Sequence, residues 1–84
     1  MTTEAQDAAK RTEIIRNLVE ARQRNDLRQI DVAEAMGIGQ PAVSELERGE
    51  TSPKLETLQR YARAIGVDIN IYLSPSTSEE DTNG

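Results

Sequence analysis

The stretch from Leu27 to Gly49, LRQIDVAEAMGIGQPAVSELERG, decides the fold, because its small residues sit where two short helices must meet. Ala33 falls where a second helix crosses closely, so a larger side chain would hold the two axes apart. Gly37 ends the first helix, in the left-handed conformation that glycine adopts cheaply. Gly39 then caps the next helix, and Pro41 falls in its first turn, where an amide hydrogen has no acceptor to lose. The pattern predicts two helices at a steep angle.

The flanking sequence predicts two more helices. From Lys10 to Arg24, apolar residues recur at helical spacing, and Asn25 and Asp26 supply a turn after them. A further helix begins near Leu55 and is terminated by Gly66. Residues 1–9 are polar, and we expect them to be a flexible N-terminus.

After Gly66 the period of the sequence changes. Four apolar residues alternate with Asp68, Asn70 and Tyr72, which predicts a strand with one apolar face over residues 67–73: Val67, Ile69, Ile71 and Leu73. Nothing else in the chain reads as a strand, so its backbone must pair with another molecule or stay solvated. Residues 74–84, SPSTSEEDTNG, are polar and acidic, and they are expected to form a disordered tail.

The central stretch resembles the helix-turn-helix of the Cro/phage-repressor (XRE) family. The run MGIGQPAVSELERG matches that family's turn and recognition helix, and further positions agree with its pattern: Leu27, Gln29, Val32, Ala33, Gly49 and Pro53. The resemblance covers residues 10–73. It implies a mainly all-α, lambda-repressor-like bundle of four helices over residues 10–66. Four helices followed by one closing strand also resemble HipB-type and HigA-type antitoxins, in which the strand pairs across a homodimer.

The resemblance implies a repressor that binds a double-stranded DNA operator of palindromic sequence as a homodimer, and its antitoxin branch allows a cognate toxin as a second partner. On the outer side of the recognition helix, with Ala42, Val43 and Leu46 turned inward, lie the candidate base-reading residues: Gln40, Pro41, Ser44 and Glu45. A glutamine amide can bond adenine at two atoms, and a carboxylate can accept from cytosine. Glu45 can equally be a charge that penalises wrong sites.

Candidate contacts to the phosphate backbone come from positively charged or amide side chains: Arg24, Arg28, Gln29, Arg48 and Lys54. Family members often have a capping Thr or Ser where this chain has Arg28 and Lys54. In similar repressors Gln29 also braces the residue at position 40. The resemblance further implies a structural ion pair between Arg22 and Glu47, although Arg22 could instead lay its stem along the core and extend its charge into water. The candidate dimer interface is the apolar side of the strand, made of Val67, Ile69, Ile71 and Leu73.

Charge and composition limit the other classes of function. The net charge is −5, but residues 10–73 carry ten acidic and ten basic side chains, so they can bind phosphates if the basic groups share a face. The chain has no cysteine and no histidine, which argues against a metal site, a cofactor and an enzyme. No membrane span or signal peptide is evident, so a cytoplasmic protein is expected. The competing class is a protein-interaction module with weak DNA binding, and a phage-type regulator without a toxin is a further alternative.

Overall fold

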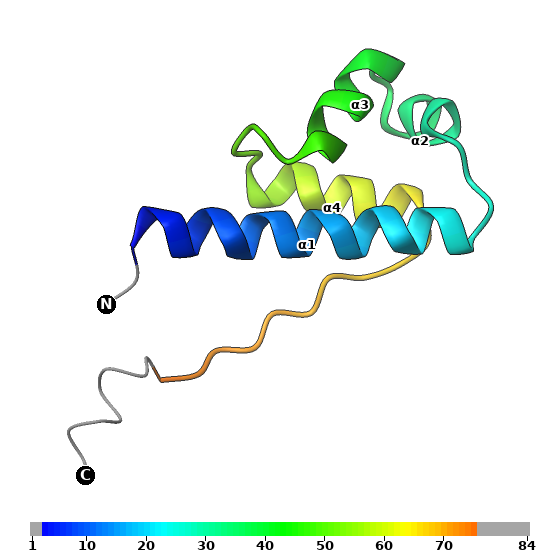
Figure 1. Ribbon diagram of the computed structural model, residues 1–84. Helices are drawn as coiled ribbons and strands as arrows, with labels where there is room; N and C mark the ends of the chain where they lie inside the picture. Colours follow the sequence, from blue (N-terminus) through cyan, green and yellow to red (C-terminus); the bar gives the residue numbers. More distant parts are fainter. Residues whose placement is uncertain (1–2, 76–84) are drawn as a thin grey trace, which may run out of the picture.

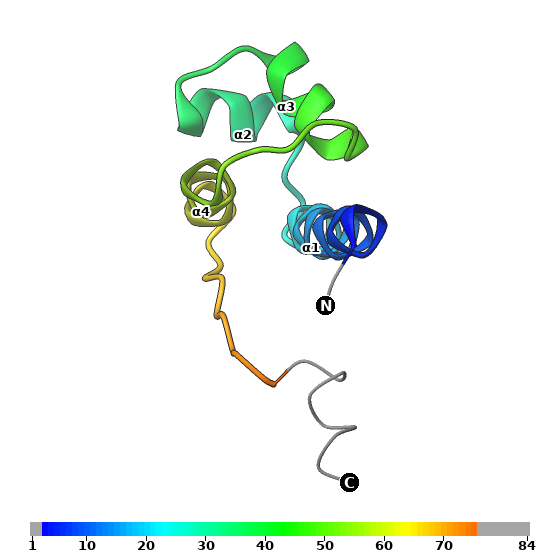
Figure 2. The ribbon, with the colours of Figure 1, turned by 90° about the vertical axis from the view of Figure 1, so that its left-hand side faces the viewer.

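Four helices make up the fold in the computed structural model, which describes residues 3–75. They are α1 (Glu4–Arg24), α2 (Gln29–Met36), α3 (Gln40–Arg48) and α4 (Leu55–Ala64). Figures 1 and 2 show α1 and α4 lying side by side, with α2 and α3 crossing over them. The fold is all-α, as the sequence predicts, and residues 3–75 contain no β-strand.

A single apolar core lies between the four helices. Val32, Val43 and Tyr61 have no exposed surface, and Ala33 is 1% exposed, as its place at a close crossing of α2 requires. The core consists of Ile15, Leu18, Ala21, Val32, Ala33, Met36, Val43, Leu46, Leu58, Tyr61, Ala62 and Ile65. All four helices contribute to it. Because α3 is too short to be stable alone, its packing against the other helices stabilises it.

Helix α1 begins earlier than the sequence analysis predicted. The expected flexible N-terminus over residues 1–9 is wrong for residues 4–9, which form the first turns of α1. Thr3 Oγ1 accepts from the Gln6 amide at 3.1 Å, and the Gln6 side chain accepts from the Thr3 amide at 2.8 Å. This reciprocal capping satisfies two donors that would otherwise face water, and it stabilises a helix start that lacks apolar periodicity.

Side chains and glycines fix the turns between helices. Gly37 ends α2 at φ +72°, in the left-handed region predicted for it, and Gly39 caps α3 in an extended conformation. Asn25 ends α1, and its side-chain amide donates to the Ile65 carbonyl at 2.8 Å, which ties the ends of α1 and α4 together. Arg60 donates to the Met36 carbonyl at 2.8 Å and so caps the last turn of α2.

The segment after α4 is extended but has no strand partner within the described chain. It runs back under α1 in Figure 1. Val67 and Ile69 are half-buried against the core, whereas Ile71 and Leu73 are 57% and 93% exposed. The strand predicted over residues 67–73 is absent from the single chain. A β-strand needs backbone hydrogen bonds to a neighbouring strand, and the described residues offer none. The predicted disordered tail, residues 74–84, lies outside the described residues except for Ser74 and Pro75, which are exposed.

None of the helices in residues 3–75 has the length and apolar character needed to cross a membrane.

The left-handed conformation of Gly37 gives a first prediction. A Cβ at Gly37 would meet no atom within 4 Å, so Gly37→Ala tests backbone conformation alone. We expect it to lower the free energy of unfolding by about 1–2 kcal/mol, because alanine is strained in this region. Gly37→Asn is the matched control and should cost less, since asparagine tolerates it. Urea unfolding measures both, and equal losses in the two variants would contradict this reason.

Candidate nucleic-acid interface

Helix α3 is fixed from its inner side. Val43 is fully buried, Leu46 is 6% exposed, and Glu47 points its carboxylate into the space between the helices. Pro41 occupies the first turn, where it leaves no helical hydrogen bond unmade. Because these residues bind one side of α3 to the body, the opposite side is held at a defined position in water.

The outer side of α3 carries the four residues predicted to read bases. Gln40, Pro41 and Glu45 are exposed, and Ser44 is partly exposed one turn along from Gln40. Ala42 was expected to turn inward, but it is exposed. The buried stripe runs through Val43, Leu46 and Glu47, so position 42 falls on its flank at 3.6 residues per turn. Ala42 therefore adds an apolar surface beside Glu45 that the sequence analysis missed.

The Arg22 and Glu47 side chains form the ion pair that the family resemblance implies. Arg22 Nε lies 2.8 Å from Glu47 Oε2, and their side chains are only 11% and 7% exposed. A second donor, Arg22 Nη2, lies 3.2 Å from Glu47 Oε1, and Nη1 donates to the Leu27 carbonyl at 2.7 Å. Burial alone would lower the pKa of Arg22, but the hydrogen bonds and charge of Glu47 raise it above its usual value.

Tyr61 also belongs to this buried cluster, although the sequence analysis did not select it. Its hydroxyl donates to Glu47 Oε2 at 2.5 Å. Burial, together with the neighbouring carboxylate, raises the pKa of the Tyr61 phenol. A signal was available in the sequence, because Tyr61 falls with Leu58, Ala62 and Ile65 at the spacing of a buried helix face.

Two glutamines connect this cluster to the outer side of α3. The Gln29 amide nitrogen donates to Glu47 Oε1 at 2.9 Å. The Gln40 amide nitrogen donates to Gln29 Oε1 at 2.7 Å, which is the brace expected from similar repressors. Gln29 was also a candidate phosphate contact, but these two bonds leave its side chain a single N–H to offer.

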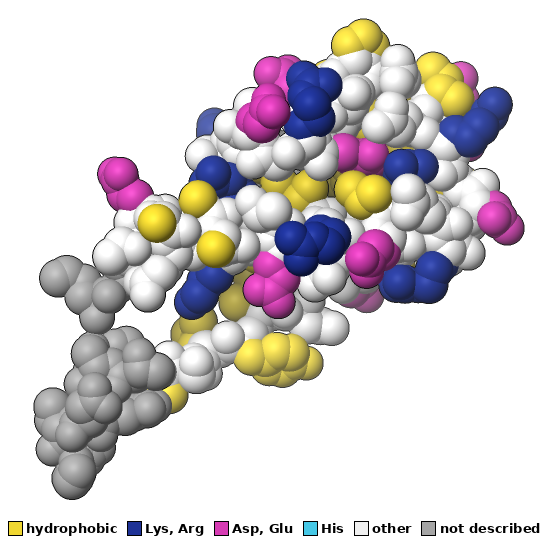
Figure 3. Space-filling view, viewed as in Figure 1, with side chains coloured by type: hydrophobic (Ala, Val, Ile, Leu, Met, Phe, Trp, Pro, Cys, Tyr) yellow, Lys and Arg dark blue, Asp and Glu magenta, His cyan; other side chains and the backbone are white. Residues whose placement is uncertain are grey.

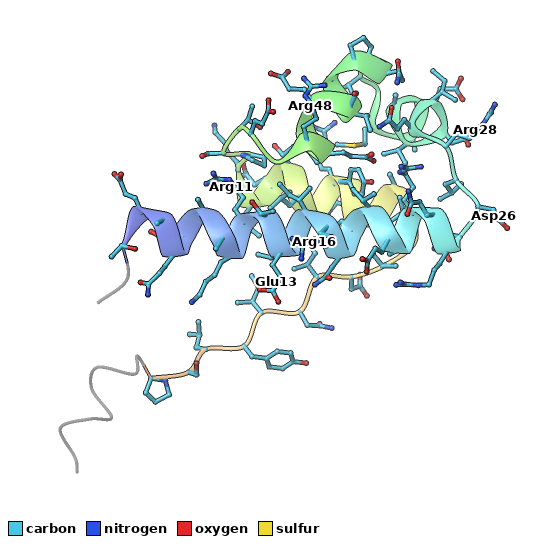
Figure 4. All side chains as sticks on the ribbon, viewed as in Figure 1. Arg11, Glu13, Arg16, Asp26, Arg28 and Arg48 are labelled. Atoms are coloured by element: carbon cyan, nitrogen blue, oxygen red, sulfur yellow. The ribbon has the colours of Figure 1, made fainter. Side chains whose placement is uncertain are left out.

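Three basic residues lie near α3 and are accessible to a phosphate. Arg28 precedes α2 and pairs with Asp31 at 2.9 Å, yet 76% of its side chain is exposed. Arg28 lowers the pKa of Asp31 to about 2 through its hydrogen bonds. Arg48, at the end of α3, contacts Ser44 at 3.3 Å and Glu50 at 3.7 Å, and Lys54 is exposed at the start of α4. Figure 4 shows Arg28 beside the start of α2 and Arg48 on α3.

Arg24 does not belong with these three. It lines a groove with Leu18, Ala21 and the segment after α4, on the side of α1 away from α3. Arg24 follows Arg22 by two residues, so it points about 200° round the helix from the side chain that contacts α3. Arg16, which the sequence analysis did not select, instead shares a hollow with Arg48 and Gly49.

Positive charge is not concentrated on one continuous patch of the visible face. Figure 3 shows acidic and basic side chains interspersed over the face on which Figure 4, in the same view, labels Arg28 and Arg48. Attraction to a nucleic acid would therefore come from a few spaced cations and not from a broad field.

Breaking the buried Arg22–Glu47 pair should lower the free energy of unfolding far more than breaking the exposed Arg28–Asp31 pair. Glu47→Ala should lower the free energy of unfolding by about 3–5 kcal/mol, because it leaves the Arg22 charge buried without a partner. Arg28→Ala breaks a pair on the surface and should cost below about 1 kcal/mol. Chemical unfolding of both variants measures the contrast. Similar costs would mean that the Arg22 charge finds water easily once Glu47 is removed.

Comparison with known proteins agrees with this geometry. Antitoxin HigA1 of Mycobacterium tuberculosis is 39% identical over 75 residues, covering 89% of this chain and 50% of that protein. The HTH-type transcriptional regulator DdrOP3 of Deinococcus deserti is 47% identical over 53 residues, covering 63% of this chain and 41% of that protein. The cryptic phage CTXphi transcriptional repressor RstR of Vibrio cholerae is 39% identical over 56 residues, covering 67% and 50%.

The chain thus spans about half the length of the curated relatives it matches. No solved structure matches it. A family model described as helix-turn-helix matches residues 18–72, which include the end of α1, the whole of α2, α3 and α4, and most of the extended segment. This match covers well over half of the chain. The protein is a member of the helix-turn-helix family of the Cro/phage-repressor type.

Proposed function

We propose that this protein is a transcriptional repressor that binds a palindromic DNA operator as a homodimer. The observation that carries the proposal is the construction of α3, whose inner side is fixed in the core and whose outer side presents polar groups to water. Gln40 can accept from adenine N6 and donate to N7, and Ser44 can bond a base or a phosphate. Glu45 can accept from cytosine N4, and Pro41 and Ala42 offer apolar surface to a thymine methyl.

Contacts to the DNA backbone would come from residues on either side of α3. Arg28 and Lys54 stand at the starts of α2 and α4, where the positive ends of the helix dipoles also favour a phosphate. Arg48 lies at the end of α3, and Gln29 keeps one N–H for a phosphate. Such contacts position the recognition helix without carrying sequence information.

The dimer is proposed to form through residues 67–73. One recognition helix reads only a few base pairs, so two must be held about 34 Å apart to enter successive major grooves. Ile71 and Leu73 expose their apolar side chains, and the backbone of this segment has no ladder partner in its own chain. Antiparallel pairing with a second copy would satisfy those groups and extend the apolar surface that Val67 and Ile69 begin.

A second candidate function is that of the antitoxin in a toxin–antitoxin operon. Its support is the 39% identity to a protein named as an antitoxin over nearly the whole of this chain. The two functions are compatible, because an antitoxin can neutralise its toxin and repress its own operon. Co-expression with the product of the adjacent gene separates them: rescue of growth from a toxic neighbour would support the antitoxin function, and a harmless neighbour would support a regulator without a toxin.

Selection of bound sites from random duplex DNA tests the main proposal. We expect an enriched motif with two-fold symmetry and half-sites one helical turn apart. Failure to enrich any motif would contradict the repressor function and favour a protein-interaction module.

Gln40 should determine one base pair in each half-site. Gln40→Ala should weaken binding to the best site by about 1–3 kcal/mol and remove the preference at that pair. Lys54→Ala is the control, because losing a phosphate contact should weaken binding to all sequences by a similar factor. Competition binding with single-base variants of the site measures both. Uniform weakening by Gln40→Ala would reassign this residue to the DNA backbone.

The apolar side chain of Ile71 should strengthen the proposed dimer. Ile71→Lys places a charge on the apolar side of the segment and should raise the dimer dissociation constant at least about tenfold, since 1.4 kcal/mol is tenfold and a buried isoleucine contributes more. Tyr72→Lys is the matched control, because residue 72 alternates to the opposite side and is already 87% exposed. Sedimentation decides the matter: an Ile71→Lys dimer as tight as the wild type would place the interface elsewhere.

A further inference from the structure

The pair of Arg28 and Asp31 at the start of α2 is held by three hydrogen bonds. Arg28 Nε donates to Asp31 Oδ2 at 3.1 Å, Nη2 donates to Oδ1 at 2.9 Å, and the Arg28 backbone amide donates to Oδ2 at 2.7 Å. The carboxylate therefore accepts along one whole edge of the guanidinium group, which orients both side chains. Glu34, one turn farther along α2, adds negative charge near Arg28.

This pair lies beside the proposed DNA surface. Gln29, the next residue after Arg28, accepts a hydrogen bond from Gln40 at the tip of α3. The side chains of Arg28 and Asp31 are 76% and 30% exposed, so a phosphate that reaches the guanidinium group also meets the carboxylate. Hydrogen bonds from Arg28 lower the pKa of Asp31 to about 2, so this carboxylate keeps its negative charge at neutral pH.

We propose that Asp31 weakens binding to DNA of unrelated sequence, because it compensates the charge of Arg28 at the edge of the DNA surface. This inference rests on the proposed function, in which Arg28 lies at the phosphate backbone. Binding to unrelated DNA depends almost wholly on the phosphates that a protein neutralises and on the counterions released from them. A guanidinium group that a carboxylate already neutralises adds little to this term. Its remaining N–H groups can still bond a phosphate and so help to position the protein.

The same carboxylate could act in the opposite direction, by holding Arg28 ready for a phosphate. Such orientation strengthens binding only where the free edge of the guanidinium group points at a phosphate. Repulsion between the carboxylate and the phosphates needs no such alignment. On unrelated DNA no base contacts fix the position of the protein, so the repulsion should outweigh the gain from orientation.

Binding to duplex DNA of random sequence, measured over a range of salt concentrations, tests the inference. Asp31→Asn removes the charge but keeps an oxygen that can accept from the Arg28 backbone amide, so the start of α2 is preserved. We expect it to bind about eightfold more tightly per subunit at about 0.1 M salt, because one more neutralised phosphate changes the slope of log K against log salt by about −0.9. An unchanged slope, or weaker binding, would overturn the inference.

Two further variants show whether the effect passes through Arg28. Glu13→Gln is matched in charge, since it also removes one carboxylate, but Figure 4 shows Glu13 on the side of α1 that faces away from α3. It should leave the slope unchanged. Arg28→Ala combined with Asp31→Asn restores the wild-type charge beside α2, so its slope should return to the wild-type value. A double variant that keeps the tighter binding would contradict the proposed role of Asp31.

A measurement without DNA separates this inference from the proposed function. In the free wild-type protein, NMR should show the Arg28 Nε–H in slow exchange with water, and Asp31→Asn should lose this signal. Its absence from the wild type would overturn the inference and leave the repressor function standing. If random duplex DNA shows the expected changes but no motif can be selected, the repressor function fails and the role of Asp31 stands. If no variant binds duplex DNA, both fail.

Discussion

The buried carboxylate of Glu47 is the group on which the rest of the structure depends. It lies on α3 and accepts hydrogen bonds from Arg22 of α1, Gln29 of α2 and Tyr61 of α4, so side chains from all four helices meet at two oxygen atoms. A carboxylate removed from water is costly unless its lone pairs are filled. The helices must therefore pack in the one arrangement that brings these donors together, and this arrangement also sets the angle at which α3 leaves the body. A chain of 84 residues buries only a small apolar core, which specifies the packing of the helices weakly. The polar centre around Glu47 makes that packing more specific.

Charge separates the roles of the two sides of α3. On the inner side, one negative group is neutralised by Arg22 and shielded from water. On the outer side, Glu45 and Arg48 remain in water, and acidic and basic side chains are interspersed over the face of the molecule shown in Figure 3. Such a surface attracts DNA weakly as a whole, so in the proposed function affinity depends on a few placed contacts and on the use of two subunits together. In the proposed function one subunit alone would not hold DNA firmly. Binding would therefore need both the polar outer side of α3, which contacts DNA, and the exposed apolar residues after α4, which join two subunits.

The central turn could be predicted from the sequence because steric demands act locally: Gly37 must be left-handed and Ala33 must be small whatever surrounds them. The start of α1 does not follow from apolar periodicity, which residues 4–9 lack; its signal in the sequence is the Thr3 and Gln6 capping pair. The residue type of Arg24 suggests a phosphate contact, but its angle around α1, which sets it apart from Arg28, Arg48 and Lys54, depends on how the helices pack. The hydrogen bonds of Tyr61 and Gln29 to Glu47 were beyond sequence reasoning, because they join residues far apart in the chain and depend on how the helices pack. The family resemblance supplied the Arg22 and Glu47 pair, which composition and spacing alone left open.

The division of α3 into a buried side and a free side has a consequence for how such a protein can diversify. Pro41, Ser44 and Glu45 contribute little to the core, so in the proposed function mutations at these three positions would alter the preferred DNA sequence while the free energy of unfolding stays nearly constant. Gln40 differs, because its amide is bonded to a side chain that reaches the interior. A lineage that duplicates this gene could explore three recognition positions one mutation at a time, whereas a change at the fourth would require compensation at Gln29.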